Sequence, residues 1–285
     1  MDKRGVRLPV GRKFANIALL FVALMLGARV MRAQTIYVLS CEYGSGVNAF
    51  APDGTVLKKL IPLGGAACTG MAVDKAGRFY VGIGGDHNNV RIFDPDGKQI
   101  GAWSLGIGVN GLATGPDGKI YVAGGSMIKS FNPDGSPGGL VINRGFEGAA
   151  TGIAVDSAGN IYVASIAGVS RYDSSGKPIG KMFSVPHDYP GCIGVGPDGK
   201  YYSGWEVPVA TFLPSGVQTQ PTMKVPLVGV RPRPTAITVG KDGKIYVGYY
   251  TIGFGKAMVA VFEPDGKMAG KAFATGGGVR GIAVR

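Results

Sequence analysis

The feature that most constrains the fold is a tyrosine that recurs at nearly constant spacing. It stands at positions 37, 80, 121, 162, 202 and 246, so that successive copies are 40 to 44 residues apart. Each copy lies within a short apolar run of the type Ile161-Tyr-Val163. Repeats of this length with strand-like content are typical of the blades of a β-propeller.

A second series of motifs alternates with the tyrosines. An aromatic residue is followed four residues later by a turn glycine at Phe50-Ala-Pro-Asp-Gly54, Phe93-Asp-Pro-Asp-Gly97, Phe131-Asn-Pro-Asp-Gly135, Tyr172-Asp-Ser-Ser-Gly176, Phe212-Leu-Pro-Ser-Gly216 and Phe262-Glu-Pro-Asp-Gly266. Proline presets φ at the second turn position, and glycine accepts the positive φ that follows. Two interleaved sixfold series predict an all-β, six-bladed propeller with four antiparallel strands in each blade.

The two ends of the repeat region complete each other. Gly281-Ile-Ala-Val-Arg285 matches the first strand of a blade, whereas Thr35-Ile-Tyr-Val38 matches the second strand of one. Pairing of the two would close the ring through backbone hydrogen bonds and leave no open edge. We therefore expect the C-terminal strand, 281–285, to close the first blade.

The clearest copy of the unit carries a family resemblance. Gly152-Ile-Ala-Val-Asp-Ser-Ala-Gly-Asn-Ile-Tyr-Val-Ala164, together with Phe93-Asp-Pro-Asp-Gly-Lys98, resembles the NHL repeat, and the resemblance extends from about residue 35 to the end. It implies a propeller but selects no function, because similar propellers serve as ligand-binding modules, interaction platforms, RNA binders, lyases and lactonases.

Residues 1–33 have a different character from the repeats. Five basic residues precede an uncharged, mostly apolar run at 14–28, which is typical of a secretory signal peptide. An uncleaved signal anchor is the alternative, and only this segment would then contact a membrane. We expect a targeting segment at 1–33, a propeller at 34–285, and a periplasmic or secreted location.

The basic charge gives little support to nucleic-acid binding. Residues 1–33 contain seven Lys or Arg and one Asp, and so account for half of the net charge of +12. The remaining charges are scattered over turns and form no dense stripe that could follow phosphates. A small molecule, a glycan or a protein is the expected partner.

The variable loops of the repeats lie on one face, where function is expected on a rigid scaffold. The candidate ligand-binding residues there are Glu42, Asn110, His187, Tyr189, Trp205, Glu206, Arg231, Arg233, Tyr250 and Arg280. Arg231 and Arg233 belong to Val230-Arg-Pro-Arg-Pro234. One interpretation is that they form, with the aromatic residues, a patch that suits an anionic or sugar-like partner. The alternative is a proline-stiffened loop with solvated arginines.

A metal centre is less favoured than a metal-free site. The repeats also resemble gluconolactonase-like propellers, which implies a divalent cation such as Ca²⁺ at the mouth of the first strands. The matching positions are Thr69, Asn110, Thr151, Gly191, Thr235 and Arg280. Of these only Asn110 is a suitable ligand, and Arg280 would repel a cation. Glu42 and Glu206 could add oxygens from neighbouring loops.

The three cysteines, at 41, 68 and 192, allow at most one disulfide within the chain. Cys41 and Cys68 fall on one face of neighbouring blades, so that a bridge between them is plausible in an oxidising compartment. Cys192 is interpreted as a small buried residue rather than a nucleophile. The leading hypothesis is an exported binding or interaction module; the alternative is a metal-dependent, lactonase-like hydrolase or lyase that uses Glu42, Asn110, Glu206 or His187.

Overall fold

The structure of the chain is a computed structural model, and it describes residues 34–41, 45–84, 89–143, 146–180, 191–204, 208–226, 230–252 and 256–285. The chain divides into two units, 1–33 and 34–285, and all described residues belong to the second. No helix long and apolar enough to cross a membrane occurs within these described ranges.

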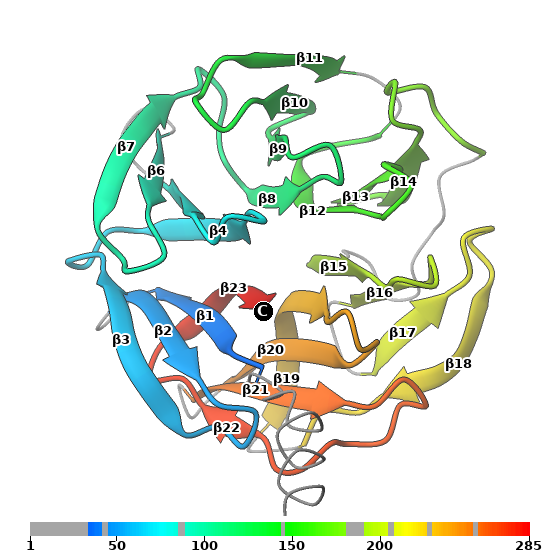
Figure 1. The fold of residues 1–285 in the computed structure, drawn as a ribbon. Helices are drawn as coiled ribbons and strands as arrows, with labels where there is room; N and C mark the ends of the chain where they lie inside the picture. Colours follow the sequence, from blue (N-terminus) through cyan, green and yellow to red (C-terminus); the bar gives the residue numbers. More distant parts are fainter. Residues whose placement is uncertain are drawn as a thin grey trace, which may run out of the picture. The chain divides into compact units, whose positions relative to one another are not determined.

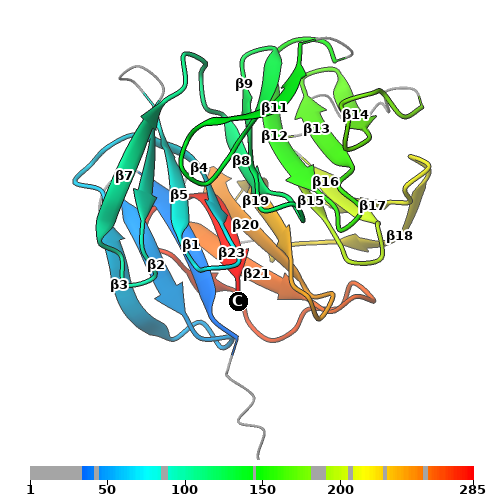
Figure 2. The same ribbon diagram turned by 45° about the horizontal axis from the view of Figure 1, so that its top comes forward.

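Six antiparallel sheets surround one axis, with their inner strands gathered at the centre (Figures 1 and 2). Blade 1 is formed by β23-β1-β2-β3, and blades 2 to 6 follow in chain order. The innermost strands, called A, are β23 (Gly278–Val284), β4 (Cys68–Val73), β8 (Gly111–Thr114), β12 (Ala150–Val155), β15 (Cys192–Val195) and β19 (Val230–Val239). The B strands are β1 (Ile36–Cys41), β5 (Phe79–Ile83), β9 (Ile120–Gly124), β13 (Ile161–Ser165), β16 (Tyr201–Gly204) and β20 (Ile245–Ile252).

The C strands are β2 (Gly46–Phe50), β6 (Asn89–Phe93), β10 (Met127–Phe131), β14 (Gly168–Tyr172), β17 (Val209–Phe212) and β21 (Ala257–Phe262). The outermost D strands are β3 (Val56–Pro62), β7 (Gln99–Ser104), β11 (Pro137–Ile142), β18 (Gln218–Met223) and β22 (Phe273–Ala274). The predicted six-bladed all-β fold is therefore confirmed.

The described residues of blade 4 form three strands, β12-β13-β14. After β14 a bridge pairs Tyr172 with Pro178. Blade 6 contains the same bridge, between Phe262 and Met268, and there the chain continues into the outer strand β22. In blade 4 the equivalent continuation falls at 181–190, outside the described residues.

The ring closes as the sequence predicts. Strand β23 pairs with β1 along its length, from Ile36 opposite Val284 to Cys41 opposite Gly278. Two further backbone hydrogen bonds, between Thr35 and Arg285, extend the pairing at one end. Blade 1 is thus assembled from the two ends of the repeat region, and the C-terminal end lies beside the axis (Figure 1).

The hydrophobic core is divided into six layers, each between two neighbouring blades. Between blades 1 and 2, for example, Leu39 and Val47 pack with Phe79 and Val81. Residues of both faces of the inner strands are apolar because every blade is covered on both sides. The fold is consequently a closed series of packed sheets with no free face.

The recurring tyrosine is explained by a contact with the turn between strands A and B. The hydroxyl of Tyr80 donates a hydrogen bond to Asp74 at 3.1 Å, and that of Tyr162 to Asp156 at 3.2 Å. Burial, followed by the nearby carboxylate charge, raises the pKa of both tyrosines to about 12. Each buried ring thus packs in the core while its hydroxyl anchors a turn.

One expectation about the loops is wrong. Val230–Pro234 is part of β19, and Tyr250 lies within β20, so neither segment is a loop. The pairing of these strands shifts register between Val230 and Pro232 and again between Pro234 and Ala236. Proline is tolerated in a strand at such irregularities because its missing N–H breaks the ladder there in any case.

Candidate functional site

The six A strands enclose a cavity of about 340 Å³ along the propeller axis. Every blade contributes, since the lining residues run from Thr69 to Val73 in blade 2 and over the equivalent positions of the other five blades. The volume is at the lower end of the range for small-molecule sites. The outer edge of each A strand pairs with strand B, so its inner edge presents unpaired backbone N–H and C=O groups to the cavity.

A β-bulge occurs at one mouth of this cavity in every blade. In blade 2, Cys68 pairs with Ile83 and Gly70 with Gly82, which leaves Thr69 as the extra residue. Register skips of the same kind leave out Thr151 in blade 4, Thr235 in blade 6 and Arg280 in blade 1. A bulge bends its strand and re-aims the side chain of the extra residue.

Blades 3 and 5 contain the same irregularity in their backbone hydrogen bonds. The N–H of Asn110 donates to the carbonyl of Ala123 at 2.8 Å, although Ala123 is already the register partner of Gly111. Gly191 and Cys192 likewise both face Gly204. The six bulged residues therefore form a ring, which we call the mouth ring: Thr69, Asn110, Thr151, Gly191, Thr235 and Arg280.

Three polar side chains of the mouth ring lie against neighbouring backbone. The Thr235 hydroxyl donates to the carbonyl of Gly248 in strand B, at 3.3 Å. The Thr69 hydroxyl is buried against strand B, where a Cβ added to Gly82 would lie 2.6 Å from it. Asn110 is exposed, but its Nδ2 donates to the carbonyl of Ala150 in the next blade, at 2.8 Å.

Arg280 differs from these neighbours. Its side chain is exposed and lines the cavity, and it makes no hydrogen bond or ion pair with any residue in the described part of the chain. The backbone on both sides of it is fixed, because Val279 pairs with Ser40 and Gly281 with Leu39. The site thus presents one free guanidinium on a rigid strand.

Two residues below the mouth ring, each A strand carries a large apolar side chain. These residues, the apolar ring, are Met71, Leu112, Ile153, Ile193, Ile237 and Ile282, and each is between 5 and 8% exposed. The layer between the two rings is made of small residues, which lets adjacent A strands approach closely. A Cβ at Gly111 would lie 3.3 Å from the Cα of Gly152 and also 3.3 Å from the amide nitrogen of Ile153.

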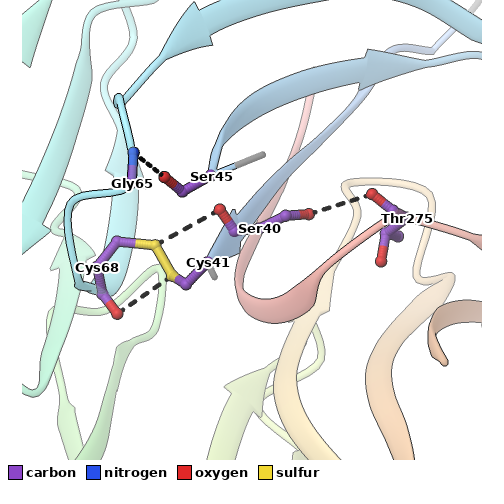
Figure 3. Close-up of a disulfide and its surroundings, with 6 residues drawn as sticks. All are labelled: Ser40, Cys41, Ser45, Gly65, Cys68 and Thr275. Atoms are coloured by element: carbon purple, nitrogen blue, oxygen red, sulfur yellow. Dashed lines mark hydrogen bonds between the residues drawn. A yellow bond between two sulfur atoms is a disulfide. The ribbon is translucent and has the colours of Figure 1, made fainter. Parts of the chain in front are cut away.

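The disulfide lies beside the mouth ring. Cys41, at the end of β1, is joined to Cys68, at the start of β4, with 5.7 Å between their Cα atoms (Figure 3). Cys68 directly precedes Thr69, and Cys41 is the register partner of Gly278. The bridge therefore fixes the distance between blades 1 and 2 at the mouth of the cavity.

Hydrogen bonds on both sides extend this cross-link. The amide of Gly65 donates to the Ser45 hydroxyl at 2.9 Å, which holds the loop that leads into blade 2 (Figure 3). The Ser40 hydroxyl donates to the carbonyl of Thr275 in the segment that enters β23, at 3.5 Å. This part of the rim is thus connected from blade 6 through blade 1 to blade 2.

The remaining cysteine is structural in its setting. Burial raises the pKa of the Cys192 thiol to about 12, and the thiol donates to the carbonyl of Gly204 at 3.4 Å. A thiolate nucleophile requires an environment that lowers this pKa instead. Cys192 therefore fills space in the small layer of the A strands.

The structure brings together only some of the predicted site residues. Asn110 and Arg280 share the mouth ring, and Arg233 pairs in register with the partly buried Tyr250 across β19 and β20. The backbone of Arg231 lies in β19, but its side chain is not described. Glu42, His187, Tyr189, Trp205 and Glu206 lie outside the described residues.

The described part of the chain contains no group of three or more His, Cys, Asp or Glu residues with metal-binding proximity. The apolar ring and the sixfold bulge are features that the sequence reading missed. A signal for the apolar ring was present in the sequence. In five units the residue nine positions before the tyrosine is apolar and follows a small residue, and Gly281-Ile282 repeats this pair at the other end of the chain.

The fold and this mouth place the chain among six-bladed β-propellers with an axial cavity. A protein of unknown function from Bacteroides caccae is similar, with a TM-score of 0.67 and 16% identity over 88% of this chain and 98% of that one. Virginiamycin B lyase from Staphylococcus aureus has a TM-score of 0.57 and 16% identity, with 87% of this chain and 86% of the lyase covered.

A streptogramin B lyase structure is similar to the same degree, with a TM-score of 0.57 and 15% identity over 82% of this chain and 86% of that one. No protein-family model matches the chain, and no curated protein matches it in sequence. At these identities the structural similarity establishes the fold alone.

Proposed function

We propose that this protein is an exported propeller of the NHL type that acts as a binding module, with its ligand held at the mouth ring. The observation that carries the proposal is the β-bulge in all six blades at one end of the axial cavity. Bulges are concentrated next to functional sites because they direct side chains that a regular ladder would not. The opposite end of the cavity is lined mainly by valine, at positions such as Val73 and Val155.

Export is supported by the signal-like segment at 1–33 and by the Cys41–Cys68 disulfide, since disulfides persist in oxidising compartments. The NHL type is supported by the motifs in the repeats and by the closed six-bladed ring. A small molecule fits the cavity volume, whereas a glycan or a protein would occupy the surrounding face.

A ligand screen by thermal shift tests the proposal, because a ligand that binds only the native state raises its melting temperature. Asn110→Trp would place a large ring at the mouth, and we expect it to abolish the response to any ligand that binds there. Asn132→Trp, in the turn between β10 and β11, is the matched control and should leave the response unchanged. If a ligand raises the melting temperature of Asn110→Trp as much as that of the wild type, its binding site lies elsewhere on the molecule.

A lyase is the second candidate function, and the similarity to virginiamycin B lyase favours it. A histidine-to-alanine variant of that enzyme, solved with quinupristin, is described as catalytically inactive. This chain has two histidines, His87 and His187, and both lie outside the described residues. To test this candidate, quinupristin is incubated with the wild-type protein, His87→Ala or His187→Ala, and the products are separated by chromatography. A lyase requires that the wild type converts quinupristin and that one of the two variants does not.

A further inference from the structure

We propose that Arg280 binds the oxyanion, a carboxylate or a phosphate, of a small molecule whose remaining part enters the axial cavity. This inference rests on the proposed function, because it names the ligand chemistry of the same mouth. It is carried by the charged side chains of the cavity lining, by the lack of a partner for Arg280 among the described residues and by its fixed position on the strand.

The charged side chains of the lining have one sign. Among all residues that line the cavity, they are Arg280 at the mouth ring and Arg285 at the opposite end, and none is acidic. The Arg285 guanidinium donates to the carbonyl of Lys75 at 3.2 Å and so has a structural partner, and the α-carboxylate of Arg285 belongs to that same end. A cationic side chain in a concave site attracts anions, so the lining favours anions at the Arg280 end.

The chemistry of the arginine selects an oxyanion. A guanidinium presents several N–H donors in a planar fork that matches two oxygens of one carboxylate or phosphate. The neighbouring polar groups of Thr235 and Asn110 already donate to backbone carbonyls, at 3.3 and 2.8 Å. The recognition energy therefore comes mainly from Arg280, together with the backbone N–H groups at the inner strand edges.

The position of Arg280 is fixed before any ligand arrives. It is the bulged residue between Val279, which is 1% exposed and paired with Ser40, and Gly281, which is paired with Leu39. Gly281 also lies against the next blade, since a Cβ there would be 2.9 Å from the Cβ of Met71. Rigid placement of a recognition group reduces the ordering cost of binding.

The shape of the cavity limits the rest of the ligand. Five extended residues of each A strand span about 16 Å, so a cavity of about 340 Å³ that follows them is narrow. Its walls are mainly the backbone edges of the A strands, because the side chains of the apolar ring are at most 8% exposed and pack in the layers between blades. A slim, unbranched chain attached to the oxyanion fits this space better than a branched group.

The test uses hexanoate, acetate and inorganic phosphate as probes on the full chain near neutral pH, with hexan-1-ol as the uncharged counterpart of hexanoate. Melting temperature and calorimetric titration are the readouts. We expect hexanoate to bind more tightly than acetate and hexan-1-ol to have no effect. A stronger response to phosphate than to hexanoate would support the same oxyanion site with a phosphorylated ligand.

Variants locate the site. Arg280→Gln should weaken hexanoate or phosphate binding at least about tenfold, since a hydrogen bond to a charged group is lost. Arg280→Lys keeps the positive charge but lacks the planar fork of donors. Its affinity for the anion should lie between those of the wild type and Arg280→Gln. Arg91→Gln, which removes an arginine of β6 that does not line the cavity, is the matched control and should bind as the wild type does. The melting temperature of unliganded Arg280→Gln should not change, because Arg280 makes no hydrogen bond or ion pair with the described residues.

Three results would overturn the inference: no response of the wild type to hexanoate or phosphate, equal responses of the wild type and Arg280→Gln, or equal responses to hexanoate and hexan-1-ol. These results are distinct from failure of the proposed function. Suppose that a neutral ligand binds the wild type and Arg280→Gln but not Asn110→Trp. That result would support the proposed binding function and contradict only the oxyanion site at Arg280.

Discussion

The hydroxyl of Tyr162, in strand β13 of blade 4, donates a hydrogen bond to the Asp156 carboxylate 3.2 Å away. The same carboxylate also accepts hydrogen bonds from the backbone N–H groups of Ala158 and Asn160, both within 2.9 Å. One aspartate therefore organises the turn between strands A and B and connects it to a tyrosine of the core. This arrangement couples the local turn chemistry of the repeat to the packing between blades.

Removal of the hydroxyl should weaken this coupling measurably. We expect Tyr162→Phe to lower the free energy of unfolding by about 1 kcal/mol, the usual net value of a buried hydrogen bond. Tyr37→Phe is the matched control. Tyr37 occupies the same position in blade 1, where strands A and B come from opposite ends of the chain and no turn aspartate exists. Denaturant unfolding of both variants checks the prediction, and equal losses would contradict it.

The buried tyrosines also predict an alkaline limit of stability. Burial, with the neighbouring carboxylates, raises the pKa of Tyr80, Tyr121, Tyr162 and Tyr202 to about 12. An unfolded tyrosine has a pKa of about 10. Between these values the unfolded chain releases protons that the folded chain retains, so stability is complete below pH 10 and falls as the pH rises toward 12.

Denaturant unfolding at a series of pH values, with tyrosinate absorbance as the titration signal, measures this limit. Tyr162→Phe should reduce the fall in unfolding free energy between pH 10 and 12 by the contribution of one tyrosine. Stability that stays constant between pH 10 and 12 would disprove the prediction.

On the acid side Asp74 is the relevant group. Burial opposes its ionisation, but hydrogen bonds from the Arg78 backbone and side chain hold its pKa below the ordinary value. Its contribution to stability is present above about pH 4 and is lost as the pH falls further.

The disulfide between Cys41 and Cys68 should stabilise the ring. The bridge closes a loop with a sequence separation of 27, for which the chain-entropy model gives about 3.5 kcal/mol. We expect the Cys41→Ala/Cys68→Ala double variant to melt at a lower temperature than the oxidised wild type. Reductant should lower the melting temperature of the wild type and leave that of the double variant unchanged.

Thiol labelling provides an independent check on the same bridge. The unreduced wild type should show one reactive thiol after denaturation, that of Cys192, and none while folded, because Cys192 is buried. Three labelled thiols in the unreduced, denatured protein would rule the disulfide out.

The ring and its closure could be predicted from the sequence because the signals are local. The turn glycines fix where each hairpin reverses, and the tyrosines of the B strands mark each blade. At Val230–Pro234 the sequence predicts a loop instead of β19, since proline, present here at 232 and 234, normally ends a strand. Two register shifts in the pairing with β20 accommodate them, and such irregularities depend on tertiary contacts rather than on composition.

The candidate site could be predicted only in part. Arg280 and Asn110 were placed at the mouth by their position before strand A, but the bulge that makes them rim residues depends on pairing between distant segments. Nothing in the residue types indicates that Thr235 turns its hydroxyl back to strand B, or that Arg280 has no partner among the residues that the structure describes. Side-chain direction at a bulge is set by the local register, which residue types alone do not determine.

The close approach of the A strands gives a last prediction, which connects stability to the cavity. Gly111→Ala would place a methyl group 3.3 Å from the Cα of Gly152 and equally near the amide nitrogen of Ile153, and this backbone can move only if blades 3 and 4 separate. Overpacking of this kind costs about 1 to 3 kcal/mol, so we expect a lower melting temperature and a change in ligand affinity at the mouth. Gly101→Ala, in the outer strand β7, is the matched control, because its nearest neighbour is the side-chain end of Ile92, also at 3.3 Å. That methyl can rotate away, and the control should melt within a few degrees of the wild type. If both variants melted alike, the inner strands would be less tightly packed than the glycine layer indicates. The width of the cavity would then not depend on that layer.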